Sequence, residues 1–254
     1  TSTFSQTDNW STYIAQWEGK PGSVILNMDL IKTAPDLSLN YLLVTGVNYS
    51  CGDDGFPIDS EWESLYAVSD SVSAIISKMT SNEMAGTYTY QCDRYDYIYL
   101  KDTTGIRKAL SDLYKTKFDN YKYYIKLEKD ANWRAYIQFL YPTEEILRIM
   151  NNQKVLDQLV AQGDDLSKPR QVDHWIYFKD KKDRENFAKK VKTMNYKVES
   201  MNIVSSTDYI YQLQISREDL VNIDSITKIT DELRKLALEY NGDYDGWETF
   251  VIKK

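Results

Sequence analysis

The chain has 254 residues but only one histidine, two cysteines and no long apolar run. Any catalytic triad or histidine-bound metal would therefore have to use His174. Cys51 and Cys92 are too few for a disulfide framework and form no C-x-x-C motif, so a zinc site is not expected. No apolar run approaches the ~20 residues that a membrane-spanning helix requires. Because no charged-then-apolar export signal opens the chain either, we expect a protein of the reducing cytoplasm that does not enter membranes.

Motifs for catalysis are also missing from the sequence. It contains no nucleophile elbow, no Walker or dinucleotide-binding loop and no H-E-x-x-H pattern. His174 lies in a strand-like run in which Ile176 and Phe178 share its face. This position favours a buried, hydrogen-bonded imidazole over a general base. We therefore expect no enzymatic activity, no cofactor and no bound metal.

The formal net charge of −7 is unevenly distributed. Residues 1–169 carry 16 Lys and Arg against 23 Asp and Glu, whereas residues 170–254 carry 15 of each. An acidic half repels phosphate backbones and attracts basic surfaces, so a protein partner is expected rather than nucleic acid. The alternative is that the excess of acidic residues simply keeps the protein soluble.

The length fits about two domains. Residues 164–169 are rich in turn-forming and charged residues, so we predict one domain at residues 1–165 and another at residues 170–254. In the first, strand-like runs alternate with helices that begin near Ser60, Thr103 and Thr143, which predicts a mixed α+β domain of two layers. The predicted strands cover residues 22–31, 39–47, 86–91, 94–100 and 121–127.

The second half gives a clearer pattern. A strand at residues 172–178 is followed by a helix capped by Asp180 and by a hairpin of residues 196–204 and 207–215, which turns at Ser205 and Ser206. Apolar residues from Ile223 to Tyr240 recur every three or four positions, which predicts a helix that ends in a left-handed cap at Asn241-Gly242, before a strand at residues 244–252. The order βαββαβ predicts a ferredoxin-like antiparallel sheet with both helices on one face and the other face open.

Two segments of the second half carry a resemblance to a known family. Asp173-His-Trp-Ile-Tyr-Phe178 and Gly242-Asp-Tyr-Asp-Gly-Trp-Glu-Thr249 are similar to the regulators of ribonuclease activity B, the RNase E inhibitors, across about residues 170–254. This resemblance implies a non-catalytic regulator that binds an endoribonuclease such as RNase E by protein–protein contact. Residues 10–145 resemble domain-of-unknown-function family six-nine-five through Thr45-Gly-Val-Asn48, Asp54-Gly-Phe-Pro57 and Phe139-Leu-Tyr-Pro142. That second resemblance implies no activity.

The closing segment also supplies the candidate partner-binding residues. Aromatic anchors rimmed by charge are a common way to hold a protein partner. The candidates are Trp175, Asp243, Tyr244, Asp245, Trp247 and Glu248. The alternative is structural: Gly242 ends a helix and Trp247 packs in the core.

Two other function classes remain open. Asp53 and Asp54, with Asp93 and Asp96, could converge on a divalent cation and cleave a phosphodiester, although Asp-Gly pairs more often form turns. A row of tyrosines in two neighbouring strands could stack sugars or bases, although cross-strand packing explains the same pattern. These tyrosines are Tyr88, Tyr90, Tyr95, Tyr97 and Tyr99.

Overall fold

The structure is a computed structural model that describes residues 9–205 and 208–253. The chain forms two compact units, residues 1–146 and residues 147–254, each an assembly of α-helices and an antiparallel sheet, as predicted. Among the described residues, no helix combines the length and the apolar character needed to cross a bilayer.

The division between the units lies earlier than the predicted linker at residues 164–169. Helix α3 (Glu144–Ala161) belongs mainly to the second unit, where Leu156 and Leu159 pack with Val172 and other apolar residues of that unit. Asp164, at the start of the predicted linker, is buried: its carboxylate accepts hydrogen bonds from Arg170 and from the backbone N–H of Ile252. The segment is therefore bonded into the second unit rather than acting as a spacer.

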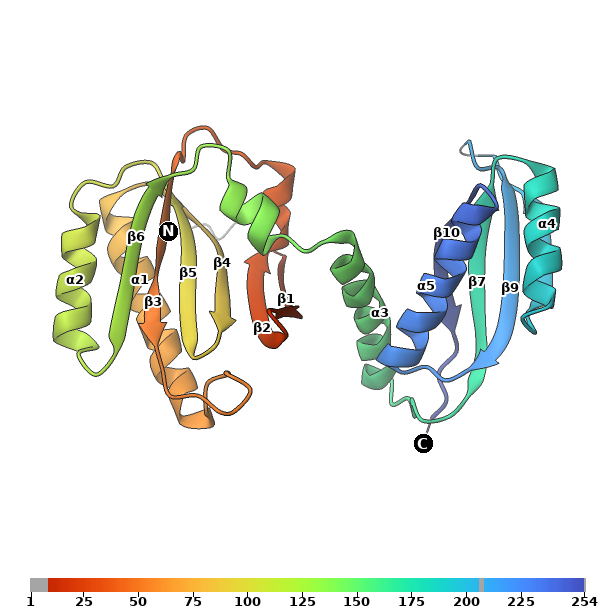
Figure 1. The fold of residues 1–254 in the computed structure, drawn as a ribbon, viewed down its shortest axis with the longest axis horizontal. Coiled ribbons are helices and arrows are strands. Elements are labelled where there is room, and N and C mark those ends of the chain that lie inside the picture. The colour runs from red at the N-terminus through yellow and green to blue at the C-terminus, as the bar shows by residue number, and fades with distance from the viewer. Residues whose placement is uncertain (1–8, 206–207, 254) are drawn as a thin grey trace. The chain divides into compact units, whose positions relative to one another are not determined.

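The first unit is built on a six-stranded sheet in which every neighbouring pair is antiparallel. Figure 1 shows four of its strands, β4, β5, β3 and β6, side by side. The strand order is β1 (Trp10–Trp17), β2 (Lys20–Asn27), β4 (Asn82–Tyr90), β5 (Asp93–Leu100), β3 (Tyr41–Asn48) and β6 (Lys122–Lys129). Strand β1 was not predicted.

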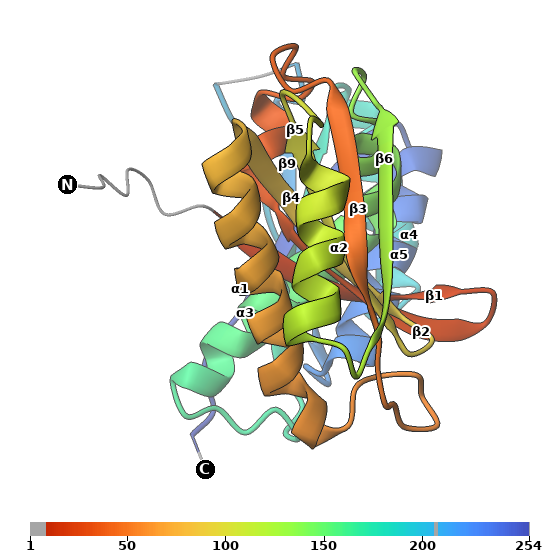
Figure 2. The same ribbon diagram turned by 90° about the vertical axis from the view of Figure 1, so that its left-hand side faces the viewer.

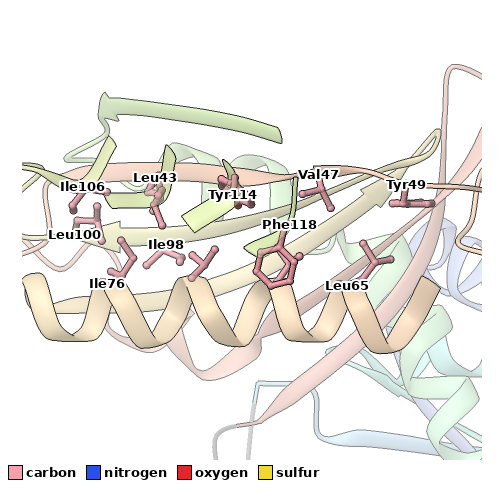
Figure 3. Close-up of a cluster of buried hydrophobic side chains, with 13 residues drawn as sticks. Leu43, Val47, Tyr49, Leu65, Ile76, Ile98, Leu100, Ile106, Tyr114 and Phe118 are labelled. Carbon is pink, nitrogen blue, oxygen red and sulfur yellow. The ribbon is translucent and has the colours of Figure 1, made fainter. Parts of the chain in front are cut away.

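Helices α1 (Trp62–Met79) and α2 (Ile106–Lys117) cover one face of this sheet, as Figure 2 shows. The stripe of α1 that faces the sheet is Leu65, Val68, Val72 and Ile76, spaced three or four residues apart. These side chains pack with Ile98, Leu100 and the apolar residues of α2 (Figure 3). Met79 is the last residue of the helix and is 40% exposed.

The opposite face of the sheet is covered in part by short helices that the sequence patterns did not reveal. Predicted strand 22–31 ends at Asn27, whose side chain accepts a hydrogen bond from Asp29 N and so starts a 3₁₀ helix at Met28–Lys32. A π-helix at Ala135–Leu140 follows β6 and packs on this face. A separate 3₁₀ turn at Asp59–Glu61 leads directly into α1. Trp133 stacks on Tyr99 of β5 with ring centroids 3.9 Å apart.

A disulfide joins Cys51, in the loop after β3, to Cys92, in the turn between β4 and β5, with Cα atoms 5.3 Å apart. Two cysteines are too few for a disulfide framework, and two residues 41 positions apart give no pairing signal in the sequence, so this single bond was not predicted. The register of β3 against β5 brings their ends together, since Asn48 is opposite Asp93. Structural disulfides persist mainly in oxidising compartments, which is at odds with the reducing cytoplasm expected from the sequence. The cytoplasmic location of this protein therefore remains a prediction.

Reduction of this disulfide is expected to destabilise the first unit. Closing a loop of 41 residues corresponds to about 3–4 kcal/mol in the chain-entropy model. The melting temperature of the full chain should therefore fall when a reductant is added. A chain carrying Cys51→Ser and Cys92→Ser should melt at the reduced temperature under both conditions. An unchanged melting profile of the wild-type chain after complete reduction would contradict the prediction.

The second unit has the predicted βαββαβ order and a ferredoxin-like sheet. Its strands lie in the order β10, β7, β9, β8, and all neighbouring pairs are antiparallel. Both helices contribute to one core cluster with the same face of the sheet. The predicted hairpin turn at Ser205-Ser206 extends outside the described residues. The elements are β7 (Arg170–Phe178), α4 (Lys181–Lys192), β8 (Lys197–Ile203), β9 (Tyr211–Asp219), α5 (Ile223–Glu239) and β10 (Gly242–Thr249).

The end of α5 differs in detail from the predicted glycine cap. Asn241, not Gly242, takes the left-handed conformation, with φ of 54°. Gly242 instead begins β10 directly against the buried ring of Phe178, where a Cβ atom would lie 2.4 Å from a ring carbon. The glycine is required there by close packing rather than by backbone freedom.

A matched pair of substitutions in β10 tests this packing. Gly242→Ala should destabilise the second unit by about 1–3 kcal/mol, because the Phe178 ring is enclosed and cannot move away freely. Gly246→Ala should change stability by at most about 1 kcal/mol, because no atom lies within 4 Å of its Cβ position. Urea unfolding of the full chain, followed by circular dichroism, measures both. Equal effects at the two positions would contradict the packing argument.

Candidate functional site

Strand β7 divides its side chains between the two faces of the second sheet. The even-numbered side chains from Val172 to Phe178 are buried on the face that α4 and α5 cover. Asp173, Trp175 and Tyr177 lie on the opposite face and are partly exposed. The strand therefore presents an aromatic pair and a carboxylate on the face that no helix of this unit covers.

The neighbouring strands extend this surface, which we call the open face. Register places Gln214 of β9 opposite Trp175 and Gln212 opposite Tyr177, and β8 continues the rows with Ser200 and Asn202. On the other side, β10 places Asp243 opposite Tyr177 and Glu248 opposite Asp173. The open face consists of Asp173, Trp175, Tyr177, Ser200, Asn202, Gln212, Gln214, Asp243 and Glu248.

Hydrogen bonds between side chains fix the polar part of the open face. Gln214 Nε2 donates to Asp173 Oδ1 over 3.0 Å, and Gln212 Nε2 donates to the Tyr177 hydroxyl over 2.7 Å. The Ser200 hydroxyl donates in turn to Gln214 Oε1 at 3.2 Å. Side chains held in this way lose little conformational entropy when a partner binds.

The open face is acidic. Asp173, Asp243 and Glu248 lie on it, and Glu199 borders it, where the Ser216 hydroxyl donates a hydrogen bond of 2.6 Å to its carboxylate. That hydrogen bond and the neighbouring Lys197 hold the pKa of Glu199 below its usual range. The face is therefore complementary to a basic surface.

Of the six candidate residues from the sequence, Trp175, Asp243 and Glu248 lie together on the open face. Trp175 is opposite Gly246, which has no side chain to cover the indole from β10. This group places one partly exposed aromatic side chain beside two carboxylates.

Tyr244 and Trp247 lie on the other side of the sheet and are not surface anchors. Tyr244 is 3% exposed, and its hydroxyl lies 2.9 Å from His174 Nδ1. Trp247 packs with a core cluster, and its indole N–H donates to Asn152 Oδ1 of α3 over 2.8 Å. The packing therefore supports a structural role for Trp247 rather than a role as a surface anchor.

Asp245 occupies the β-bulge between Tyr244 and Gly246 and lines a pocket of about 170 Å³ between α3, α5 and β10. Two arginines line the same pocket, and both already have partners. Arg148 pairs with Asp231 at 3.3 Å, and Arg234 donates to the Tyr244 carbonyl at 3.1 Å while its guanidinium covers the Tyr244 ring. Arg148 is thus neutralised by Asp231, whereas Arg234 has no carboxylate partner among these contacts, and its buried Nε atom has no hydrogen-bond partner among the described residues.

His174 is fully buried in the core of the second unit. Burial, with a smaller contribution from the positive charge of Arg217, lowers the pKa of the imidazole to about 3. In the described part of the chain, no hydrogen-bond partner reaches its Nε2 atom. A neutral, enclosed imidazole cannot exchange protons with a substrate at neutral pH, which agrees with the structural role predicted for it.

The buried histidine predicts a defined pH dependence of stability. Its folded pKa lies below the ~6.5 of an unfolded chain, so the unfolded state binds the proton first and stability falls as pH drops from about 6.5 toward 3. Between pH 7 and pH 5 this group should remove about 2 kcal/mol. The single Hε1 resonance in the NMR spectrum should not titrate near pH 6.5. A His174→Gln chain should lack this component of the pH slope, and a midpoint near 6.5 in the folded protein would contradict the assignment.

Three of the four aspartates considered as metal ligands accept hydrogen bonds within the fold. Asp54 Oδ1 accepts the Phe56 N–H and closes a turn, and Asp93 accepts a hydrogen bond from Asn48. Asp96 is buried beside Thr87, whose hydroxyl donates to it over 2.8 Å, and burial raises the pKa of its carboxyl. Within residues 9–205 and 208–253, no three His, Cys, Asp or Glu side chains gather closely enough to hold a metal ion.

The tyrosines considered as a stacking platform lie as the alternation predicts. Tyr95, Tyr97 and Tyr99 share the face of the first sheet opposite α1 and α2, because Ile98 and Leu100 point into the core beneath those helices. Tyr99 is fully buried under Trp133, whereas Tyr95 and Tyr97 are partly exposed. Part of the row is therefore core and part is surface.

The sequence analysis did not assign the glutamines of β9 to the site. Gln212 and Gln214 alternate with Leu213 and Ile215, and this period of two indicates a strand with one wet face. Which strand lies beside β9 could not be read from that pattern. The hydrogen bonds to Asp173 and Tyr177 depend on the register with β7.

The fold and surface define a two-domain α+β chain whose second domain has an acidic sheet face that none of its own helices covers. The chain belongs to a family of unknown function, DUF695, whose model matches residues 8–141. Residues 149–249 match the family described as regulator of ribonuclease activity B. Both resemblances and their order along the chain are thereby confirmed, and helix α3 falls largely within the second match.

Comparisons with individual proteins add little. No curated protein matches the chain. Among solved structures, an unknown protein from Galdieria sulphuraria covers 84% of this chain and 99% of its own, at 9% identity and a TM-score of 0.22. A candidate glycine cleavage system transcriptional repressor covers 85% and 98%, at 8% identity and a TM-score of 0.21. At these TM-scores the likenesses carry no argument about fold or function.

Proposed function

We propose that this chain is a non-catalytic regulator that binds a ribonuclease through the open face of its second domain. The family match over residues 149–249 carries the proposal, because that family is described as regulating ribonuclease activity. An endoribonuclease such as RNase E is the first partner to test. The regulator would act by protein–protein contact, without a cofactor or a metal.

The chemistry of the open face supports a protein partner. Trp175 supplies an aromatic anchor beside Tyr177, and the hydrogen-bonded Gln212 and Gln214 form an ordered polar surround. Its carboxylates disfavour direct contact with RNA phosphates and suit a basic segment of a protein. The binding residues proposed are therefore Trp175, Asp243 and Glu248, whereas Tyr244 and Trp247 would support the sheet from behind.

Removal of the Trp175 side chain tests this function. With purified RNase E and a fluorescent RNA substrate, the wild-type chain should slow cleavage and form a complex detectable by calorimetry. Trp175→Ala should weaken binding by about 2 kcal/mol or more, roughly thirtyfold in Kd, because an aromatic anchor at the centre of a contact is lost. Binding should also weaken at higher salt, since the contact joins unlike charges.

The matched control is Leu238→Ala on α5, which removes an apolar side chain that is 68% exposed on the helical side of the domain. This variant should inhibit as the wild type does. Circular dichroism of both variants checks that the domain remains folded. Undiminished inhibition by Trp175→Ala would exclude the open face, and no effect of the wild-type chain on the enzyme would exclude RNase E as its partner.

A further inference from the structure

Six partly exposed aromatic rings form a row on the face of the first sheet opposite α1 and α2, which we call the aromatic row. Tyr95 meets Tyr124 at 5.5 Å between ring centroids, and Tyr97 meets Phe139 at 5.8 Å. Tyr88 lies beneath the row and contacts Phe139, so it joins the two halves. The exposed members are Trp17, Tyr90, Tyr95, Tyr97, Tyr124 and Phe139.

Two glycines of the sheet lie directly beneath rings of the aromatic row. Gly46 of β3 lies opposite both Tyr95 and Tyr124, whose rings meet above it. Gly22 of β2 lies under Trp17, where a Cβ atom would be 2.9 Å from the indole ring. From β2 to β6 the row crosses five strands, a span of roughly 19 Å at the ~4.8 Å spacing of neighbouring strands. This length suits an extended ligand better than a single ring.

Two lysines beside the row already have partners. Lys126 and Glu128, which follow Tyr124 on the same face of β6, form an ion pair at 2.8 Å, and Lys20 donates to the Gln91 side chain at 2.6 Å. Burial and the nearby Asp93 raise the pKa of Tyr95 to about 12, so its hydroxyl stays neutral. A surface that binds single-stranded nucleic acid combines stacking rings with free cations, and Lys126 and Lys20 are both already engaged by side-chain partners.

A pocket of about 260 Å³ adjoins the row and shares Phe139 with it. Glu128, Lys129, Arg134 and Gln138 line this pocket and offer carboxylate, ammonium, guanidinium and amide groups within a small space. Groups of this mixed kind can donate to and accept from hydroxyls, whereas a pocket for an ion would carry one sign of charge.

We propose that the aromatic row binds a neutral oligosaccharide. The apolar C–H faces of sugar rings would pack against the exposed sides of Tyr124, Tyr95 and Tyr97, whose rings meet their neighbours edge-to-face or tilted, and sugar hydroxyls would hydrogen-bond in the pocket beside Phe139. The function lies in the first domain and does not depend on the ribonuclease regulation proposed for the second.

Titration calorimetry of the full chain tests the proposal. The probes are cellohexaose, maltohexaose, mannohexaose and chitohexaose, with oligothymidylate as the nucleic-acid comparison. At least one oligosaccharide should bind with a Kd that does not change when salt is raised, because the ligand is neutral. Tyr124→Ala should weaken that Kd about three- to tenfold, since one stacking ring is removed from an exposed position.

Tyr123→Ala is the matched control: it removes the same side chain from the adjacent residue, which points to the helical face and stacks on Tyr114. Its Kd should match that of the wild type, and melting curves confirm that both variants fold. The proposal is overturned if no oligosaccharide binds at millimolar concentration, if only oligothymidylate binds, or if both variants lose affinity equally.

Discussion

Burial of every second side chain of β7 is the constraint from which the second domain takes its shape. Ile176 and Phe178 are fully enclosed beneath the helices, and burying each such side chain contributes about 1.5–3 kcal/mol. The same burial keeps His174 neutral, and its contact with the Tyr244 hydroxyl links β7 to β10 inside the core. A shift by one residue would expose this set, so the positions of Asp173, Trp175 and Tyr177 on the open face are fixed by the core.

A second constraint, shared by both domains, is the pairing of aromatic side chains with glycine on the neighbouring strand. Trp175 faces Gly246 in the second domain, and Tyr95 and Tyr124 flank Gly46 in the first. A Cβ atom at Gly46 would lie 1.8 Å from the Arg94 carbonyl oxygen, so this strand approach requires glycine. Because glycine has no side chain, each of these positions leaves room for the aromatic rings of the neighbouring strand on the same face of the sheet.

The sequence was most informative where periodicity was unbroken. The helical stripe of α5 and the alternation in β7 and β9 predicted the βαββαβ order of the second domain, because each pattern reports burial on one face. The short π-helix at residues 135–140 and strand β1 were not predicted from the sequence, because neither shows such a pattern. Helix α3 was recognised, but its membership of the second domain depends on contacts with distant residues such as Val221, which no local pattern records.

A β-bulge in β10 explains why the two candidate residues Tyr244 and Trp247 both lie on the helical face of the sheet. Strict alternation would put residues 244 and 247 on opposite faces, yet the bulge at Asp245 adds one residue to β10 and turns both rings toward the helices. Gly246 was a signal for that bulge, since an isolated glycine within a strand often marks one.

The bulge has two consequences for function. It takes both rings away from the open face, and it leaves Trp175 facing a glycine, so a partly exposed indole lies on an acidic face. A partner that inserts there would meet side chains already ordered by their own hydrogen bonds, and its affinity would depend mainly on the ring.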